Sequence, residues 1–313
     1  MAPAGRKSRM VLACRDCPGR VTHRDIVTGT ETTIRILTVS ALAGLLGAVG
    51  LRLTWDEVKT ALNQCRFSAI LLVNFVAVPA LTVAAVAWLG LHRDIAVAMV
   101  LLAASPFAPV VPVFARMARA DLALAAGLTA AYPLISMLLT PLAAQGALWM
   151  LANADTVRLD IVASLGMLAA TISLPLAAGV FVRHRAPELG QTLLRPVEVI
   201  SEATGAASLA FVTATAYGSI LSLGWKAWIA MALIFELSLL LGWKLGGPAS
   251  GARRVVALGT SNRNIALALL MALQSFAGTP VVSAVVGNGL LLIALGLLHV
   301  GWWRLVGKER AAA

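Results

Sequence analysis

A polar run interrupts an apolar stretch of membrane-spanning length between Val255 and Gln274. The whole stretch is about as long as the ~20 residues that cross a bilayer, so the polar run falls near mid-membrane. An uncompensated Arg at that depth costs roughly 2.5–3.5 kcal/mol on insertion scales, and such residues generally mark a pathway or a binding site. The predicted substrate- or ion-binding residues are therefore Thr260, Ser261, Asn262, Arg263 and Asn264.

Arg263 is the residue of this run whose chemistry is most specific. A guanidinium is a fixed cation with five donors, and it fits carboxylates bidentately. We interpret Arg263 as a tethered cation that binds a substrate's anionic group or neutralises the site. Glu236, in the middle of another apolar stretch, is the expected partner, because an ion pair lowers the cost of burying both charges. The alternative is a purely structural pair, with Asn262 and Asn264 only satisfying interrupted backbone.

A second interruption is predicted in the segment Pro106-Phe107-Ala108-Pro109-Val110-Val111-Pro112. Three prolines at i, i+3 and i+6 cannot lie inside one regular helix, because each lacks an N–H and its ring clashes with the preceding turn. We expect a break here and a short helix that ends near Met117. The predicted helix-breaking residues are Pro106, Pro109, Pro112 and Gly259.

Composition identifies the class of protein that holds these two breaks. Of the 313 residues, 59% are hydrophobic and only 12% are charged, whereas soluble domains carry about 25% charged residues. Lipid permits only helices or closed barrels, and continuous apolar runs favour helices. The net charge of +11 is interpreted as cytoplasmic loop charge rather than a nucleic-acid footprint. Cys14 and Cys17 lack a second ligand pair, so no metal site is predicted.

The apolar runs predict an all-α polytopic membrane protein with ten transmembrane helices. A polar stretch with near-helical apolar spacing, Arg52–Arg66, follows the first of them. The predicted helices cover residues 34–51, 67–89, 94–105, 106–117, 122–151, 161–182, 197–221, 225–245, 255–274 and 280–306.

The distribution of positive charge predicts the orientation. With ten crossings and a cytoplasmic N-terminus, most of the 25 Lys and Arg residues fall on the inside, as the positive-inside rule requires. We therefore expect a multi-pass protein of the cell's inner (plasma) membrane with both termini cytoplasmic. Residues 1–33 are interpreted as a basic cytoplasmic tail, and residues 307–313 as a C-terminal tail.

The predicted helices divide into two halves, residues 34–151 and 152–306. Each half has five crossings, so the two halves have opposite orientations in the membrane. The fourth crossing is interrupted in both, and paired interrupted helices at corresponding positions are typical of a transporter site between inverted repeats. The alternative is that prolines and polar residues are merely tolerated in these helices.

Several stretches, taken in order, resemble the bile acid:sodium symporter family over about residues 34–306. Asn74–Pro79 is similar to the N/Q-F-x-x-x-P pattern of its second helix, and Leu138–Leu142 to its L-L-T-P-L. Asp94–Leu124 is similar to the run through its first crossover. Gly259–Leu269 is similar to the G-x-x-N-x-x-L-A-L-A of its ninth helix.

The resemblance implies a core domain with crossed, broken helices 4 and 9, and a panel domain of helices 1, 2, 6 and 7. It also implies uptake of organic anions coupled to sodium by alternating access. Thr129 lies where a hydroxyl of the core domain would face the crossover, although bonding to its own helix is the simpler interpretation.

The sequence departs from this family at the sodium ligands. Val111 and Pro112 stand where the family has a Ser and an Asn that bind sodium, and Ala257 stands in place of an acidic ligand. A Gln ligand is replaced by Ser261. Because a hard cation needs several oxygens, these changes argue against sodium coupling and favour Arg263 as its replacement.

These features favour a secondary transporter of a small organic anion. One alternative is a proton-coupled carrier in which Glu236 titrates. Another is a non-transporting membrane receptor or scaffold, which the missing sodium ligands suggest. No phosphate loop or nucleophile elbow is visible, so neither ATP drive nor an intramembrane enzyme is expected.

Overall fold

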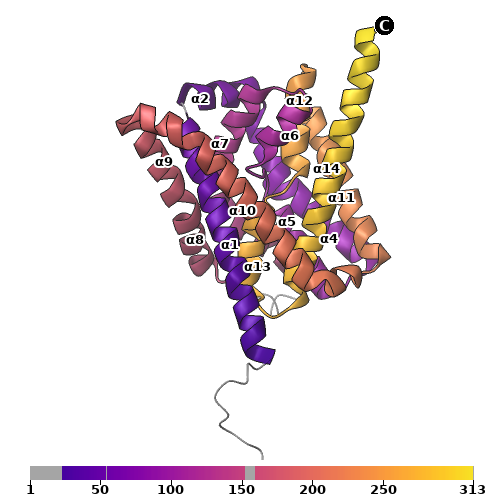
Figure 1. Cartoon of the computed structure of the whole chain (residues 1–313). Coiled ribbons are helices and arrows are strands. Elements are labelled where there is room, and N and C mark those ends of the chain that lie inside the picture. The colour runs from indigo at the N-terminus through magenta and orange to yellow at the C-terminus, as the bar shows by residue number, and fades with distance from the viewer. Residues whose placement is uncertain (1–22, 54, 152–158, 313) are drawn as a thin grey trace, which may run out of the picture.

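The computed structural model describes residues 23–53, 55–151 and 159–312. In this part of the chain the regular secondary structure is entirely helical, and long helices run across the molecule side by side (Figure 1). The all-α prediction is confirmed for these residues. In the first half the helices are α1 (His23–Arg52), α2 (Trp55–Gln64), α3 (Phe67–Leu72), the π-helical η1 (Val73–Ala77), α4 (Val78–Leu89), α5 (Arg93–Ala103), α6 (Val111–Met117) and α7 (Leu122–Leu151).

The second half continues the same architecture. Across the described residues, eight helical stretches are long and apolar enough to cross a membrane, which supports the predicted polytopic class. The second-half helices are α8 (Ile161–Leu168), the π-helical η2 (Ala169–Ser173), α9 (Leu174–Arg185), α10 (Pro187–Leu221), α11 (Trp225–Leu245), α12 (Ser250–Ser261), α13 (Ile265–Ser275) and α14 (Pro280–Ala312).

The predicted third and fourth helices are the two halves of one discontinuous crossing. α5 is 11 residues long, or about 16 Å, which is roughly half the ~30 Å hydrocarbon core of a bilayer. α6 is shorter still, at 7 residues, and the two together cross once, as α12 and α13 do. Counting the α5–α6 pair together with the eight spanning stretches gives nine candidate crossings in the described residues, so ten transmembrane helices are not confirmed.

The two ends of the described chain lie on opposite faces of the molecule (Figure 1). Near the start of α1, the Glu31 carboxylate accepts a hydrogen bond from the N–H of Gly278, beside the start of α14. Near the other end of α14, Trp303 packs against the guanidinium of Arg254 in the first turns of α12. The two ends of the described chain therefore do not share one face, and the prediction that both termini are cytoplasmic is not confirmed.

Several predicted boundaries move while the element type holds. α1 begins at His23 rather than Ile34, so it takes in part of the predicted tail, and α10 begins at Pro187 rather than Val197. α14 continues through the predicted C-terminal tail to Ala312. Cys14 and Cys17 lie outside the described residues.

The two broken helices cross at their breaks, as predicted. The N–H of Phe107 donates to the carbonyl of Gly259, and the N–H of Ala108 donates to the carbonyl of Asn262, each at 3.3 Å. In the opposite direction, the N–H of Asn264 donates to the carbonyl of Ser105 at 2.8 Å. Irregular backbone at membrane depth is stable only when protein satisfies its polar groups, and here each break satisfies the other.

A proline accounts for the π-helical segment η1. Pro79 lies in the first turn of α4, directly after η1. It has no N–H, and in an α-helix its ring would clash with the carbonyl of Phe75. The wider π turn accommodates it, and η1 carries the buried Asn74 toward the protein interior. Pro175 follows η2 in the same way.

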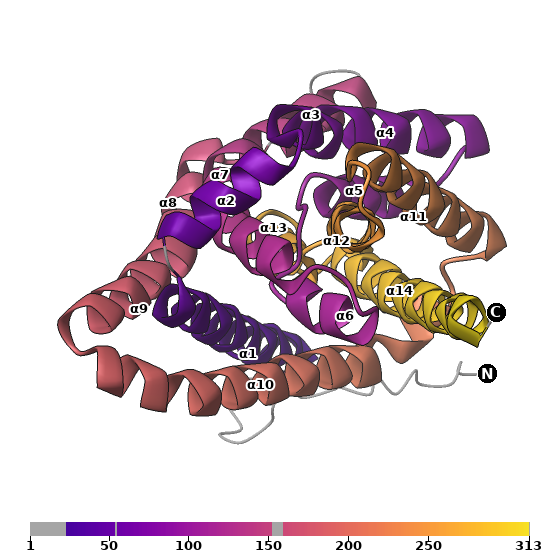
Figure 2. The same cartoon turned by 90° about the horizontal axis from the view of Figure 1, so that it is seen from above.

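The helices form two groups, which Figure 2 shows from above. α1, α10 and the α8–η2–α9 stretch pack together on one side. Gly50 and Gly179 bring α1 and α9 very close, since a Cβ on either glycine would lie within 2.4 Å of the other helix's backbone. The predicted second helix, α3–η1–α4, packs instead against α5, α7 and α11. The predicted panel of helices 1, 2, 6 and 7 is therefore not confirmed, because the second of these packs with the other group.

Candidate functional site

The polar run lies at the crossing of the broken helices, and several of its side chains serve the backbone there. The Ser261 hydroxyl donates to the carbonyl of Ala257 at 2.9 Å, and Nδ2 of Asn262 donates to the carbonyl of Leu258 at 3.1 Å. Oδ1 of Asn264 accepts from the N–H of Leu267 at 3.1 Å and so caps α13. These bonds favour the structural interpretation of Asn262 and Asn264.

Arg263 is 4% exposed and lies inside the protein. Its Nη1 donates two hydrogen bonds, one to Oδ1 of Asn74 and one to the carbonyl of Ala103, each at 3.1 Å. Its Nη2 is buried and has no hydrogen-bond partner among the described residues. The guanidinium thus uses one nitrogen to join η1 and α5 to the break and leaves the other nitrogen free.

Asn74 is the hub of the contacts around Arg263. It is fully buried, and its Nδ2 donates to the carbonyl of Ile70 at 2.9 Å and to the hydroxyl of Tyr132 at 3.1 Å. The same nitrogen lies 3.4 Å from Oγ1 of Thr260, a residue of the polar run. A polar residue in an apolar helix is a plausible interhelical hydrogen-bonder, and the structure identifies Tyr132 and Arg263 as the partners of Asn74.

An aromatic wall closes the crossing on the side of α7. The rings of Phe107 and Tyr132 stack with centroids 4.1 Å apart. Phe107 adopts a left-handed backbone conformation, with φ of 55°, which is uncommon for a residue with a side chain. Its ring fills the space beside Gly259, where a Cβ would lie 2.0 Å from the ring. Gly259 lies within α12 rather than at its break, contrary to the prediction, and the close approach of Phe107 requires a glycine there.

The predicted Arg263–Glu236 ion pair does not form. Oε2 of Glu236 lies 3.3 Å from Nε2 of His299, on α14, and the Glu236 side chain is 42% exposed. Nδ1 of His299 contacts the carbonyl of Leu295 in its own helix. Helical geometry explains the miss: Glu236 and Arg263 have similar depth, but Glu236 lies on another face of α11. No described carboxylate pairs with Arg263.

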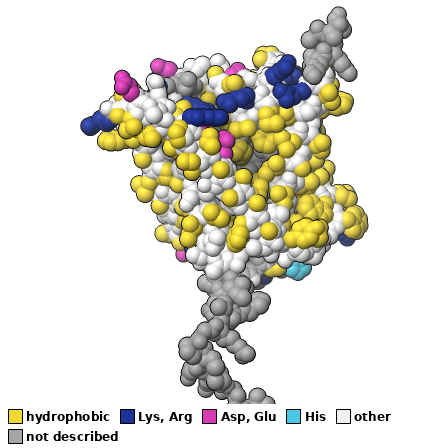
Figure 3. Space-filling model, in the orientation of Figure 1, with side chains coloured by type: hydrophobic (Ala, Val, Ile, Leu, Met, Phe, Trp, Pro, Cys, Tyr) yellow, Lys and Arg dark blue, Asp and Glu magenta, His cyan; other side chains and the backbone are white. Residues whose placement is uncertain are grey.

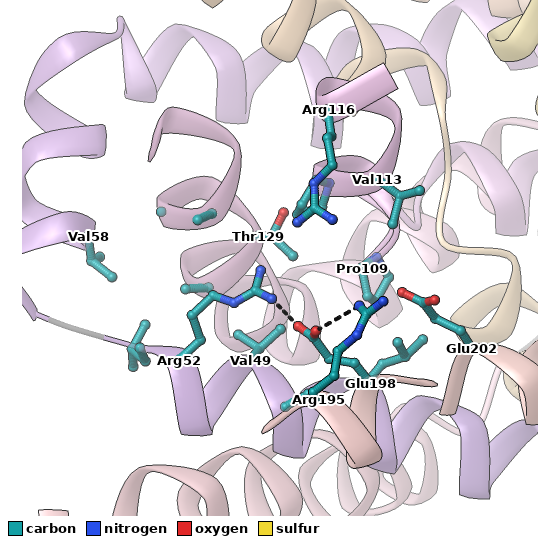
Figure 4. Close-up of a pocket in the computed structure, with 17 residues that line it drawn as sticks. Val49, Arg52, Val58, Pro109, Val113, Arg116, Thr129, Arg195, Glu198 and Glu202 are labelled. Carbon is teal, nitrogen blue, oxygen red and sulfur yellow. Dashed lines mark hydrogen bonds and ion pairs between the residues drawn. The ribbon is translucent and has the colours of Figure 1, made fainter. Parts of the chain in front are cut away.

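A cleft of about 70 Å³ opens between the two groups of helices (Figure 4). α1 and α10 form one wall, and the other comprises Pro109, α6 and α7. Pro109 and Pro112 line the cleft from the first break, so the break contacts the cleft on one side and the Arg263 cluster through Phe107 on the other.

Five charged side chains line this cleft. Glu198 forms an ion pair with Arg52 and lies 3.9 Å from Arg195. The side chains of Arg116 and Glu202 have no ion pair or hydrogen bond with any described residue. In Figure 4 the guanidinium groups of Arg52, Arg116 and Arg195 point into the cleft from three different elements. The lining carries net positive charge, with one free guanidinium.

Thr129 is the one predicted binding residue that lines the cleft. It is buried, and its Oγ1 has no partner among the described residues. The cleft arginines were missed as site residues because each lies near the end of an apolar stretch. That position is also typical of topology-determining charge, and only packing distinguishes the two.

The positions that the resemblance assigns to sodium do not fit a sodium site. The side chains of Val111, Pro112 and Ala257 offer hydrocarbon only, and Val111 and Ala257 are fully buried. Two oxygens near the crossing, Oδ1 of Asn74 and the carbonyl of Ala103, accept from Arg263 instead. Sodium binds oxygen ligands, and at least two of the oxygens near the crossing already accept hydrogen bonds from the Arg263 guanidinium.

One comparison with known proteins identifies a family. The model of the Sodium Bile acid symporter family matches residues 39–223, which is more than half of the chain. No curated protein matches the chain. The matched region runs from α1 through α10 and includes the first break, Asn74 and the whole lining of the cleft. The chain belongs to the sodium bile acid symporter family.

Proposed function

We propose that the protein is a secondary transporter of a small organic anion that works by alternating access. The cleft between two packed groups of helices, lined by a free arginine beside a crossed pair of broken helices, is the observation that carries this proposal. Discontinuous helices that meet at the midplane are typical of transporter binding sites. In this proposal, α1, α8–α9 and α10 move relative to the remaining helices.

The inverted repeat is proposed in a shorter form than the sequence suggested. α1, α3–α4, α5–α6 and α7 form one set of four crossings, and α10, α11, α12–α13 and α14 form the other, with α8–α9 between them. The two discontinuous crossings, α5–α6 and α12–α13, then occupy the same place in each set.

Arg116 is the proposed anion-binding residue. It projects from α6, directly after the first break, and has no ion pair with a described residue. Arg52 and Arg195 are held by Glu198 and set the local potential. Thr129 supplies a hydroxyl with no partner in the same cleft. An anionic head group bound here would contact Pro109, so binding could shift the backbone of the first break.

The positive charge of the described residues supports one orientation. Figure 3 shows Lys and Arg gathered at the face where α14 ends. By the positive-inside rule this face is cytoplasmic, so the C-terminal end of α14 lies inside and the start of α1 outside, in the plasma membrane. The cleft arginines lie near these helix ends, so in the proposed orientation the cleft faces the cytoplasm. The positive side chains at this face are Arg52, Lys59, Arg66, Arg116, Arg119, Arg183, Arg185, Arg195, Lys244, Arg253, Arg254 and Arg304.

Arg263 is proposed to replace the coupling cation. Its hydrogen bonds to Asn74 and Ala103 hold a positive charge permanently at the crossing, and the hydrocarbon side chains noted above leave few oxygens for sodium. Transport is then independent of sodium. The Glu236–His299 pair supports the second candidate, a proton-coupled carrier, because a carboxylate and an imidazole lie in contact between two membrane-spanning helices. In that case the pH dependence of transport disappears in Glu236→Gln.

The test is uptake of radiolabelled organic anions, bile salts included, by proteoliposomes in sodium and in choline buffer. We expect equal uptake in both buffers. Arg116→Gln should weaken substrate affinity about tenfold, the value expected for losing one hydrogen bond to a charged group. Arg66→Gln is the matched control, because Arg66 is exposed on the same face and does not line the cleft.

Two results would overturn the proposal. Loss of affinity in Arg66→Gln as well as Arg116→Gln would show a general surface-charge effect rather than a binding residue. The absence of flux and of binding for every anion would favour the receptor or scaffold.

A further inference from the structure

A second, much smaller cavity lies beside Arg263, on the opposite side of the crossing from the aromatic wall. It occupies about 20 Å³, measured as the space open to the centre of a water molecule. It is bounded by α5, α11, α14 and the second break, and no residue lines both this cavity and the cleft. Its polar lining consists of Ser238, Ser261, Arg263 and Asn288.

Two polar groups of this lining have no partner. Nη2 of Arg263 and Oδ1 of Asn288 are buried without a hydrogen bond to any described residue, and the two residues are 4% and 5% exposed. Leaving a buried donor of a charged group without an acceptor destabilises the folded protein. Such a cost is expected where a ligand supplies the missing bond.

The charge of the residues that line the cavity indicates the charge of the ligand. The guanidinium is permanently positive, and no described carboxylate forms an ion pair with it. The two serine hydroxyls already donate to carbonyls of their own helices, at 2.6 Å for Ser238 and 2.9 Å for Ser261. The uncompensated charge is therefore positive, and it requires a negative partner at this depth.

The size and remaining lining define the ligand's class. A cavity needs roughly 10–15 Å³ on this measure to hold one water, so this one admits a monatomic ion but not an organic carboxylate or a sulfate. Most of its lining is apolar, with Met99, Leu102, Met231, Phe235 and Leu292 among the lining residues. Hydrocarbon walls with one cation suit a weakly hydrated, polarisable halide. Rotation of the Asn288 amide turns its N–H₂ group toward such an ion.

We propose that this cavity is a binding site for a single halide ion, chloride in the cell, held by Nη2 of Arg263 and by the amide of Asn288. The ion neutralises the guanidinium inside the membrane, while Nη1 remains bonded to Asn74 and Ala103. The site is separate from the cleft, and it does not require that the proposed substrate be correct.

Bromide provides the direct test, because its anomalous scattering distinguishes it from water. Crystals of the detergent-purified full chain grown in sodium bromide should show one anomalous peak within hydrogen-bonding distance of Nη2 of Arg263. An ordered water there without an anomalous signal would overturn the proposal, and so would an empty cavity. This readout uses the unaltered protein and needs no transport.

Thermal stability provides a second readout. Bromide or chloride should raise the melting temperature relative to gluconate at equal ionic strength, because ligand binding stabilises the folded state. Asn288→Leu should weaken the halide affinity about tenfold, as expected for a lost hydrogen bond to an ion, so a higher halide concentration is needed for the same rise in melting temperature. Gln274→Leu is the matched control, since Oε1 of Gln274 is also buried and without a partner, but Gln274 does not line the cavity. Equal halide responses in the two variants would contradict the assignment.

The proposed halide site and the proposed transport function can be tested independently. A bromide peak in a protein that transports no organic anion would support the halide site and reject the transporter. Organic-anion uptake that is unaffected by replacing chloride, in a protein without a bromide peak, would do the reverse.

Discussion

Nη1 of Arg263 donates a hydrogen bond to Oδ1 of Asn74 at 3.1 Å, across 189 residues of sequence. The bond joins the break between α12 and α13 to the π-helical turn η1, and it exists because Pro79 widens that turn. Arg263 therefore has a neutral amide partner instead of the carboxylate that its charge suggested. Its positive charge remains uncompensated by the described residues.

Removing the amide should destabilise the protein. In Asn74→Leu one N–H of Arg263 loses its acceptor, and leaving a buried donor of a charged group unpaired costs at least about 1–3 kcal/mol. Thr82→Val is the control, because Thr82 is equally buried but its hydroxyl bonds only to Val78 of its own helix. Denaturant unfolding in mixed detergent measures both variants. Equal losses of stability would show that Asn74 contributes nothing beyond its local bond.

Removing the guanidinium should change the ion dependence of uptake. Arg263→Ala frees Oδ1 of Asn74 and the carbonyl of Ala103. We expect uptake in choline to fall about tenfold, which corresponds to roughly 1.4 kcal/mol, and sodium to restore part of it. Uptake by the unaltered protein that already requires sodium would show that other oxygens build a cation site, and that Arg263 is not its substitute.

Close packing at the crossing makes Gly259 sensitive to a single methyl group. Gly259→Ala places a Cβ against the Phe107 ring, and such overpacking costs typically 1–3 kcal/mol. Phe107→Leu leaves room for that methyl group, so the double variant should lose less stability than the sum of the two single variants. A double-mutant cycle on melting temperature measures this coupling. Additive losses would mean that the two residues do not meet in solution.

The proposed orientation predicts opposite labelling at the two ends of α11. Lys226 follows its first residue and Lys244 precedes its last, so single cysteines there should face opposite sides. A membrane-impermeant maleimide added to intact cells should label Lys226→Cys and not Lys244→Cys. The reverse pattern would invert the proposed orientation.

The labelling background lacks Cys14, Cys17 and Cys65. Burial raises the pKa of the Cys65 thiol, which slows its reaction, but its removal makes the assay unambiguous. The permeabilised cell is the positive control, in which both introduced cysteines should react.

The local features of this protein are readable from its sequence. Hydropathy located the apolar helices, and the ends of α7 and α11 agree with the predicted ranges. The prolines and the polar run marked both breaks, because missing N–H groups and buried polar side chains have local consequences. The positive-inside rule predicted an orientation from the sequence, but the rule was applied to ten crossings, whereas we count nine in the described helices.

The number of crossings depended on tertiary structure. Residues 94–117 contain enough apolar sequence to suggest two helices, but α5 and α6 are each too short to cross alone and stack into one path through the membrane. Hydropathy measures apolar length and does not record the direction of the chain after a break.

The partners of each charge were also decided only by packing. Glu236 and Arg263 lie at similar depths, yet the rotation of α11 points Glu236 to His299, and the π turn brings Asn74 to Arg263. Likewise, Arg116 lines a cleft only because α1 and α10 pack opposite α6 and α7. Depth in a membrane follows from residue counting along one helix, whereas a contact also requires the rotation and packing of its neighbours.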